Sequence, residues 1–206
     1  MSDRSGAAPA PLVECVPNVS EGRDPEVIRA IADAAASVGE AALLHVDPDR
    51  WHHRTVLTLA GPPEPLAEAV VRLVREAVDR IDLTGHAGEH PRIGAADVVP
   101  FVPLDRLDGP GGLVPDGRSG ADMATCVDLA RRVGRRLADE LELPVFLYGE
   151  AALREGRDAP AAFRKGGFEA LAGAIGRDPD REPDYGPRRV HPTAGASAVG
   201  ARPPLV

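Results

Sequence analysis

The sequence is short of aromatic residues, which occupy only 3% of its 206 positions. The apolar fraction is nevertheless 43%, as in ordinary soluble domains, so the core must be built from Val, Leu, Ile and Ala. A chain of this length can bury a sizeable core of that kind. We therefore expect one compact domain, or one domain and a fraction of a second.

Cysteine and long apolar runs are also scarce. The two cysteines, Cys15 and Cys126, are far apart and show no metal-ligand spacing, which excludes a disulfide framework and a cysteine-based zinc site. No run approaches the roughly 18 apolar residues of a membrane-spanning helix, and residues 1–11 lack the apolar core of a signal peptide. We expect a cytoplasmic protein with no membrane partner and a disordered leader over residues 1–11.

Positive charge is not in excess either. The formal net charge is -8 and the isoelectric point is near 5.3. Because nucleic-acid backbones are bound by clustered Lys and Arg, this balance argues against nucleic acid as a main partner. The arginines at positions 131, 132, 135 and 136 have helical spacing and acidic neighbours, which favours a salt-bridged solvent face over a binding patch.

Hydrophobic periodicity predicts a regular order of elements over the first 148 residues. Strands are expected at 12–16, 42–46, 54–60, 95–102 and 144–148, and helices at 25–39, 64–81 and from about 121 to 141, with a Gly- and Pro-rich loop over 104–120. The order β-α-β-β-α-β, followed by an extra helix and strand, predicts an α+β fold. We expect a ferredoxin-like sandwich with its helices on one face of a mixed sheet.

The densest group of reactive side chains lies at residues 86–92, His-Ala-Gly-Glu-His-Pro-Arg. A zinc site on His86 and His90 is disfavoured because Gly88 and Pro91 interrupt any helix there, and because Glu89 does not follow the first histidine. We therefore predict no metal. A loop histidine beside a carboxylate is suited to carrying a proton. The alternative is that His86 caps the preceding helix and His90 is buried and hydrogen-bonded without a reaction to perform.

Other polar positions are open to two interpretations. Arg54 and Arg92 each match the geometry of a substrate carboxylate, but each could equally form a structural ion pair. Asp47 could orient a histidine or cap a loop, and Glu89 is a second candidate for orienting His90. We expect the neighbouring His52 and His53 to be exposed.

A second polar segment lies at residues 186–195. Its glycines and prolines favour an extended backbone with free amide and carbonyl groups, while Arg188, Arg189 and His191 supply positive charge for carboxylates. This composition suits an anionic ligand. The alternative is a plain linker between domains, because the charged, Pro- and Gly-rich stretch at 177–187 is also typical of a domain edge.

Three separated blocks resemble the formiminotransferase family: residues 13–23 (VECVPNVSEGR), 86–101 (HAGEHPRIGAADVVPF) and 147–152 (LYGEAA). The resemblance implies transfer of a formimino group from N-formimino-L-glutamate to N5 of tetrahydrofolate as co-substrate, with His90 as general acid/base. It also implies a folate-binding segment formed by Gly186, Pro187, Arg188, Arg189, Val190, His191, Pro192, Thr193, Ala194 and Gly195.

The resemblance further implies that substrates lie in a groove between two subdomains. On this basis we expect residues 12–180 to form the first subdomain, and 181–206 to be a linker and the truncated start of the second, ending in an unpaired strand. A homodimer, or a partner that supplies the second subdomain, would then complete the groove. Two alternatives remain: transfer involving a different small amine, since His45 and His53 replace the family's usual Asp and Asn, or a non-catalytic folate-binding or assembly module.

Overall fold

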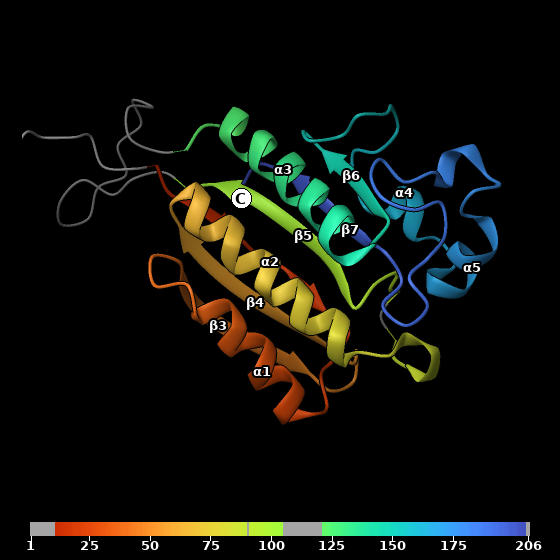
Figure 1. Ribbon diagram of the computed structural model, residues 1–206, viewed down its shortest axis with the longest axis horizontal. Helices are drawn as coiled ribbons and strands as arrows, with labels where there is room; N and C mark the ends of the chain where they lie inside the picture. The colour runs from red at the N-terminus through yellow and green to blue at the C-terminus, as the bar shows by residue number, and fades with distance from the viewer. Residues whose placement is uncertain (1–10, 90, 105–120, 205–206) are drawn as a thin grey trace, which may run out of the picture.

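The computed structural model describes residues 11–89, 91–104 and 121–204, so the predicted leader, His90 and nearly all of the predicted 104–120 loop lie outside the described residues. Its elements follow the predicted order (Figure 1). They are β1 Val13–Cys15, β2 Asn18–Val19, α1 Pro25–Ala36, β3 Ala42–Asp49, β4 Arg54–Gly61, α2 Pro63–Arg80, the 3-10 turn η1 Leu83–Gly85, β5 Ala96–Pro103, α3 Met123–Leu141, β6 Val145–Gly149, α4 Ala161–Arg164, α5 Gly167–Ala174, the 3-10 turn η2 Pro179–Arg181 and β7 Ser197–Ala201.

The strands form one mixed sheet. β1 and β2 are two halves of one strand interrupted at Val16 and Pro17, and both pair antiparallel with β4 on one side and β5 on the other. β3 pairs antiparallel with the outer side of β4. Beyond β5, the strands β7 and β6 continue the sheet in parallel. The resulting order is β3, β4, β1/β2, β5, β7, β6.

Two apolar clusters lie on opposite faces of this sheet. In β6, Val145 and Leu147 belong to the larger cluster with α1, α2 and α3, whereas Phe146 and Tyr148 belong to a smaller one. Alternate residues of a strand point to opposite faces, so α4 and α5, which contribute Phe163 and Leu171 to the smaller cluster, cover the second face. The predicted α+β ferredoxin-like arrangement is confirmed, and α4 and α5 add a partial layer beneath β6 and β7.

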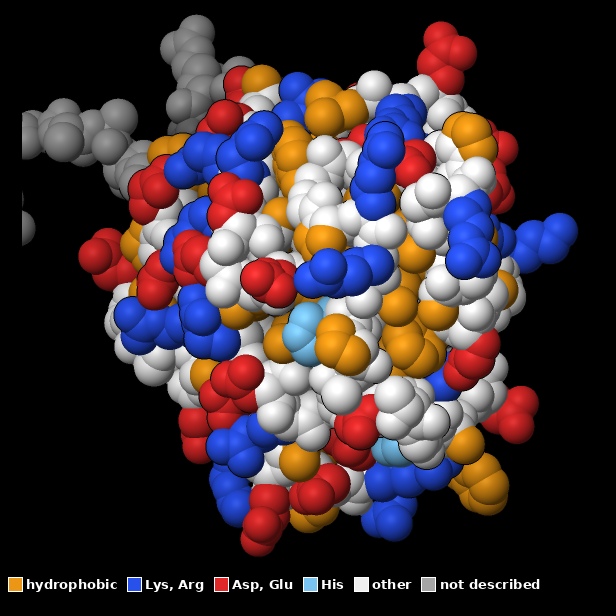
Figure 2. Space-filling model, turned by 45° about the vertical axis from the view of Figure 1, so that its right-hand side comes forward, with side chains coloured by type: hydrophobic (Ala, Val, Ile, Leu, Met, Phe, Trp, Pro, Cys, Tyr) orange, Lys and Arg blue, Asp and Glu red, His pale blue; other side chains and the backbone are white. Residues whose placement is uncertain are grey.

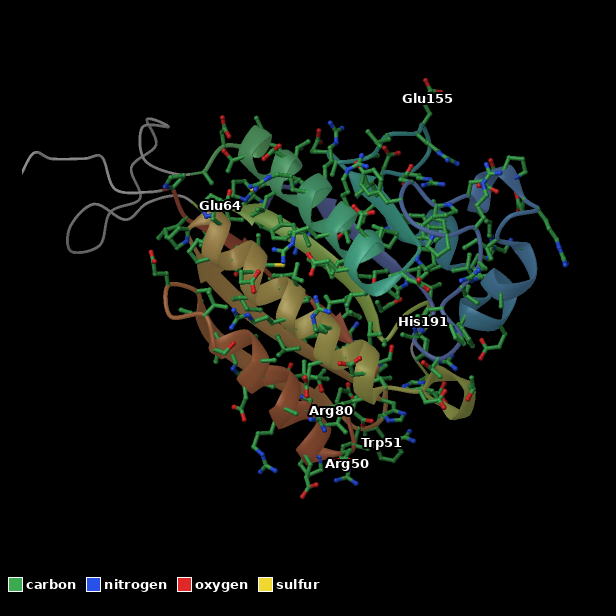
Figure 3. The ribbon with its side chains drawn as sticks, viewed as in Figure 1. Arg50, Trp51, Glu64, Arg80, Glu155 and His191 are labelled. Carbon is green, nitrogen blue, oxygen red and sulfur yellow. The ribbon has the colours of Figure 1, made fainter. Side chains whose placement is uncertain are left out.

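Local sequence signals account for several helix boundaries. Asp24 caps α1 by accepting hydrogen bonds from the backbone amides of Glu26 and Val27, and Pro25 occupies the first turn, where its missing N–H costs nothing. Between α2 and α3, Arg132 binds Glu64 at 2.8 Å and Arg136 binds Glu68 at 3.1 Å (Glu64 is labelled in Figure 3). The predicted salt-bridged solvent face is therefore present.

Two expectations about strands are wrong. β3 was expected to end at residue 46, but it continues to Asp49, because Pro48 needs no donor on an edge strand. The strand near the C-terminus was expected to be unpaired, but β7 is bonded to β5 and to β6. Its small residues allow this central place: a Cβ on Gly200 would lie 2.6 Å from the Tyr148 ring.

No helix in the described parts of the chain is long and apolar enough to span a bilayer.

Candidate functional site

Three loops meet at one end of the sheet: the loop from β2 to α1, the tip of the β3–β4 hairpin, and the chain between η1 and β5, which contains residues 86–92 and is called here the 86–92 loop. The backbones of two of these loops approach closely at Gly88. A Cβ on Gly88 would lie only 2.7 Å from the carbonyl oxygen of His52. In Figure 3, Arg50, Trp51 and Arg80 lie together at this end. Charges of both signs are mixed over the face shown in Figure 2.

His53 joins all three loops. Its Nε2 lies 3.0 Å from Glu21 Oε1 and its Nδ1 lies 3.2 Å from the carbonyl oxygen of Ala87. The side chain is only 14% exposed, so the expectation that His53 is exposed is wrong. His52 does lie largely exposed, with Nδ1 2.5 Å from Asp49 Oδ2.

Glu21 is held in its ionised form. Burial raises the pKa of this carboxyl, but the backbone amides of Asp24 and Arg23, together with His53, lower it by more. Its Oε1 accepts from those two amides at 3.0 and 2.7 Å. The result is a fixed negative charge at the start of α1, where a helix N-terminus favours one.

His86 stacks on His53, with ring centroids 4.1 Å apart and planes 9° apart. Its Nε2 donates to the carbonyl oxygen of His53 at 3.2 Å, which leaves Nδ1 as an acceptor. Nδ1 is buried and has no partner in the described part of the chain. Burial, followed by the charges of His53 and Arg92, lowers the pKa of His86, so its neutral form is favoured. The residue does not cap α2, which ends at Arg80 with its cap at Ile81.

Arg92 closes the 86–92 loop on itself. Its NH2 group donates to the carbonyl oxygen of His86 at 2.6 Å and pairs with Glu169 Oε1 at 3.0 Å. The Arg92 side chain is 12% exposed, whereas that of Glu169 is 65% exposed. Of the two interpretations open for Arg92, the structure therefore contains the structural ion pair.

Asp97, in β5, holds the C-terminal end of the 86–92 loop in place. It is buried, and its Oδ1 accepts from the backbone amide of Ile93 at 2.8 Å while Oδ2 pairs with Arg164 of α4 at 2.5 Å. Burial raises the pKa of the Asp97 carboxyl, and the charge of Arg164 only partly offsets this. Arg164 also donates to the carbonyl oxygen of Pro91, so α4 is tied directly to the loop.

The second predicted segment lies against both flanks of the 86–92 loop. Leu83 donates its amide to Thr193, Ala95 donates to Ala194, and Ala196 donates to Ile93. His191 closes a tight turn, because its Nδ1 accepts the amide of Ala194 at 3.0 Å. Burial lowers the pKa of His191, an effect that Glu142 opposes.

The beginning of the same segment has a structural role. Gly186 adopts φ 83°, and a Cβ there would lie 2.2 Å from the carbonyl oxygen of Leu143. Just before it, the buried Asp184 accepts from the Leu147 amide and pairs with Arg157 at 2.5 Å. A hollow of about 400 Å³ lies farther along, lined by Ala172, Ile175, Gly176, Arg177, Arg188, Arg189 and Val190.

Beside the stacked histidines lies an open hollow of about 270 Å³, lined by Glu21, His53, Arg80, Ile81, Asp82, Thr84, Gly85 and His86. It therefore offers a carboxylate, imidazoles and a guanidinium to a small polar molecule. Among the described residues, no group of three or more His, Cys, Asp or Glu side chains is arranged to hold a metal ion.

Comparison with known proteins identifies the family of the chain. Residues 12–202 match the formiminotransferase domain, N-terminal subdomain. The chain belongs to the formiminotransferase family. The match runs past residue 180, where the sequence predicted a boundary.

Several curated proteins are similar to this formiminotransferase chain. A glutamate formimidoyltransferase of Streptococcus pyogenes serotype M1 is 42% identical, with 96% of this chain and 61% of the relative covered. A glutamate formimidoyltransferase of Thermoplasma acidophilum is 44% identical, with 95% and 60% covered. A formimidoyltransferase-cyclodeaminase of Sus scrofa is 44% identical, with 93% and 32% covered. The chain thus spans less than two thirds of the length of each of these relatives.

In this formiminotransferase structure the predicted supporting residues lie in different elements. Arg92 lies in the 86–92 loop, and Arg54 begins β4, where its charge acts on Asp97. Asp47 is exposed on the edge strand β3, and none of the described histidines hydrogen-bonds to it; Glu89 is also exposed. His90 lies outside the described residues.

Sequence reasoning missed Glu21 and Asp97 as site residues, and it misjudged the surroundings of His53. Glu21 and Asp97 both lie in blocks that resemble the family, which was the available signal. For His53 the sequence held no such signal, because its burial results from the approach of Gly88 from a distant loop.

Proposed function

We propose that this chain forms one wall of a site in which a formimino group passes from N-formimino-L-glutamate to N5 of tetrahydrofolate. The observation that carries the proposal is the set of backbone hydrogen bonds between residues 193–196 and the two flanks of the 86–92 loop, at Leu83 on one side and at Ile93 and Ala95 on the other. Two segments that the sequence associates with proton transfer and with folate are thereby neighbours. Family membership supports the same reaction class.

The chemistry requires two proton movements. The N5 amine of tetrahydrofolate attacks the amidine carbon of the donor, and the tetrahedral adduct collapses when the C–N bond to glutamate breaks. One proton leaves the attacking nitrogen and one reaches the departing amine, giving 5-formiminotetrahydrofolate and glutamate. A single imidazole can do both, and such general acid/base assistance contributes about 10²–10⁴-fold.

We assign this role to His90. Its two chain neighbours, Glu89 and Pro91, belong to a loop that Arg92, Asp97 and Arg164 hold in place. Acid/base catalysis needs groups held in position, and the described residues on both sides of position 90 are held in this way. His86 is the less suitable proton carrier, because its Nδ1 is buried and its lowered pKa disfavours protonation.

For the folate we assign the 186–195 segment. The side chains of Arg188 and Arg189 are 75% and 76% exposed, so their guanidinium groups are accessible to carboxylates. Arg188 also binds Glu182 at 2.7 Å, and an incoming carboxylate would compete with this partner, whose side chain is 14% exposed. The neighbouring 400 Å³ hollow suits the glutamate end of the molecule better than the flat pterin.

We infer that further polypeptide supplies the opposite wall of the groove, and this is supported by the relatives' greater length, since the chain spans 61% and 60% of the two glutamate formimidoyltransferases. We propose that this is either a second subdomain or a second copy of the chain. A different donor amine is the alternative, favoured by His45, which lies exposed on β3 where the family usually has a carboxylate.

The test mixes purified protein with N-formimino-L-glutamate and tetrahydrofolate, with and without the second subdomain of a relative, and measures 5-formiminotetrahydrofolate. His90→Ala should abolish transfer and keep tetrahydrofolate binding by calorimetry, and His52→Ala is the matched control. Near-normal transfer by His90→Ala would contradict the assigned role. Folate binding without product from a panel of formimino donors would favour a non-catalytic module.

A further inference from the structure

The linkage of three loops by one histidine suggests a role that the transfer chemistry does not require. The acceptors on the two sides of His53 are a carboxylate, Glu21, and a backbone carbonyl, that of Ala87. A carbonyl oxygen accepts only, and so does an ionised carboxylate. Both hydrogen bonds therefore form together only when both ring nitrogens of His53 carry hydrogen.

The backbone at this position is also unusual. His53 adopts φ 51°, in the left-handed region, which residues other than glycine seldom enter, although Asn, Asp and His do so more often than the rest. In this conformation the His53 side chain hydrogen-bonds to the carbonyl oxygen of Ala87, and the His53 carbonyl oxygen accepts from His86. Such strain persists only where the surroundings impose it, and it gathers at functional sites.

We propose that His53 is a positioning residue whose doubly protonated form locks the 86–92 loop to the start of α1. When one ring nitrogen loses its proton, either Glu21 or Ala87 loses its partner, and the loop is held less firmly. The proposal rests on the proposed function only in naming what the loop does. The lock itself is a property of the described residues.

The charges around His53 come from several elements. The Glu21 carboxylate, before α1, lies 3.0 Å from the ring of His53. His86 stacks on that ring, and Arg92 lies in the 86–92 loop with His86. Arg80 and Asp82, after α2, line the hollow beside it. Because burial favours the neutral form of His86, the proposed arrangement does not require two charged rings in the stack.

The chain offers a matched pair of variants. His53→Asn keeps a residue that tolerates the left-handed region, but its short amide cannot reach both acceptors. His52→Asn makes the same change at the adjacent position, where the histidine is 53% exposed and lies beside Asp49.

Two measurements on the intact protein test the lock. Ring ¹⁵N NMR follows how many nitrogens of His53 are protonated as the pH changes. Hydrogen exchange, corrected for the intrinsic rate, follows protection of the amides in the 86–92 loop. We expect the two to change with one midpoint, and His53→Asn to lower protection about tenfold at low pH, equal to about 1.4 kcal/mol. His52→Asn should match the wild type.

Two outcomes would overturn the lock. One is protection of the loop amides from exchange that does not change with the protonation of His53. The other is equal protection in the wild type and in His53→Asn. In the transfer assay, His53→Asn should lower kcat several-fold and lose the part of the pH dependence that follows protonation of His53, while His52→Asn keeps the wild-type profile. If no variant transfers the formimino group, the proposed function fails, but NMR and hydrogen exchange still decide the lock.

Discussion

The backbone amide of Leu83 donates to the carbonyl oxygen of Thr193 at 2.8 Å, which joins the turn after α2 to the turn before β7. Leu83 lies just before the 86–92 loop, and Thr193 lies within the 186–195 segment. Because the bond is between backbones, it depends on the path of the chain rather than on side-chain identity. The relative position of the 86–92 loop and the 186–195 segment therefore follows from the path of the backbone.

We predict that Gly94→Ala is strongly destabilising. A Cβ there would lie 1.8 Å from the carbonyl oxygen of Ala196, and this contact is between backbones that pair across the sheet end. Overpacking of this kind costs about 3 kcal/mol. Urea denaturation measures it.

Gly85→Ala is the matched control, because a Cβ at Gly85 meets no atom within 4 Å. Its free energy of unfolding should stay within about 0.5 kcal/mol of the wild type. Equal stability of the two variants would show that residues 94 and 196 can separate, which would weaken the case for a fixed site.

Most of the fold was predictable because its signals are local. Apolar periodicity marked α1, α2 and α3, and Asp24 with Pro25 marked the start of α1. The place of β7 was not predictable. Its small residues carry little strand signal, and only tertiary pairing shows that Gly200 is needed where the chain passes the Tyr148 ring.

The candidate site was predictable in part for the same reason. The 86–92 loop is recognisable from residue types within one short segment. The supports of that loop, Asp97, Arg164 and Glu21, come from other elements, and each is an ordinary residue in its own stretch. Burial of His53 likewise depends on a contact between two loops, which sequence spacing does not encode.

The stability of the protein should fall as the pH drops below 6.5. His86 and His191 both have a folded-state pKa below their ordinary 6.5, chiefly because of burial. A group with a lowered pKa contributes stability above its unfolded value and loses it as the pH falls through the folded value. Each adds a slope of at most about 1.4 kcal/mol per pH unit.

Urea denaturation between about pH 7.5 and about pH 5, the range over which such histidines titrate, tests this prediction. His86→Asn and His191→Asn should each flatten the decline in the free energy of unfolding, whereas His52→Asn should not. An unchanged slope in both variants would mean that these two imidazoles are as easily protonated in the folded protein as in the unfolded chain.

Arg164→Met should cost more stability at neutral pH than in acid. The change leaves the buried Asp97 carboxylate without its partner, and a buried ion pair broken in this way costs about 3–5 kcal/mol. Removing the guanidinium raises the pKa of Asp97 further above its ordinary value, so the carboxyl takes up a proton more readily. Because the neutral carboxyl is easier to bury, the difference from the wild type should shrink as the pH falls through that raised pKa.

Glu64→Gln is the control for this pair, since the side chains of Glu64 and Arg132 are 73% and 43% exposed and such pairs contribute about 1 kcal/mol or less. Denaturant unfolding at several pH values measures both variants. A pH-independent loss in Arg164→Met would mean that α4 supports the 86–92 loop through packing and through its bond to Pro91 rather than through Asp97. In that case Asp97→Asn, which can still accept the amide of Ile93, should be nearly as stable as the wild type.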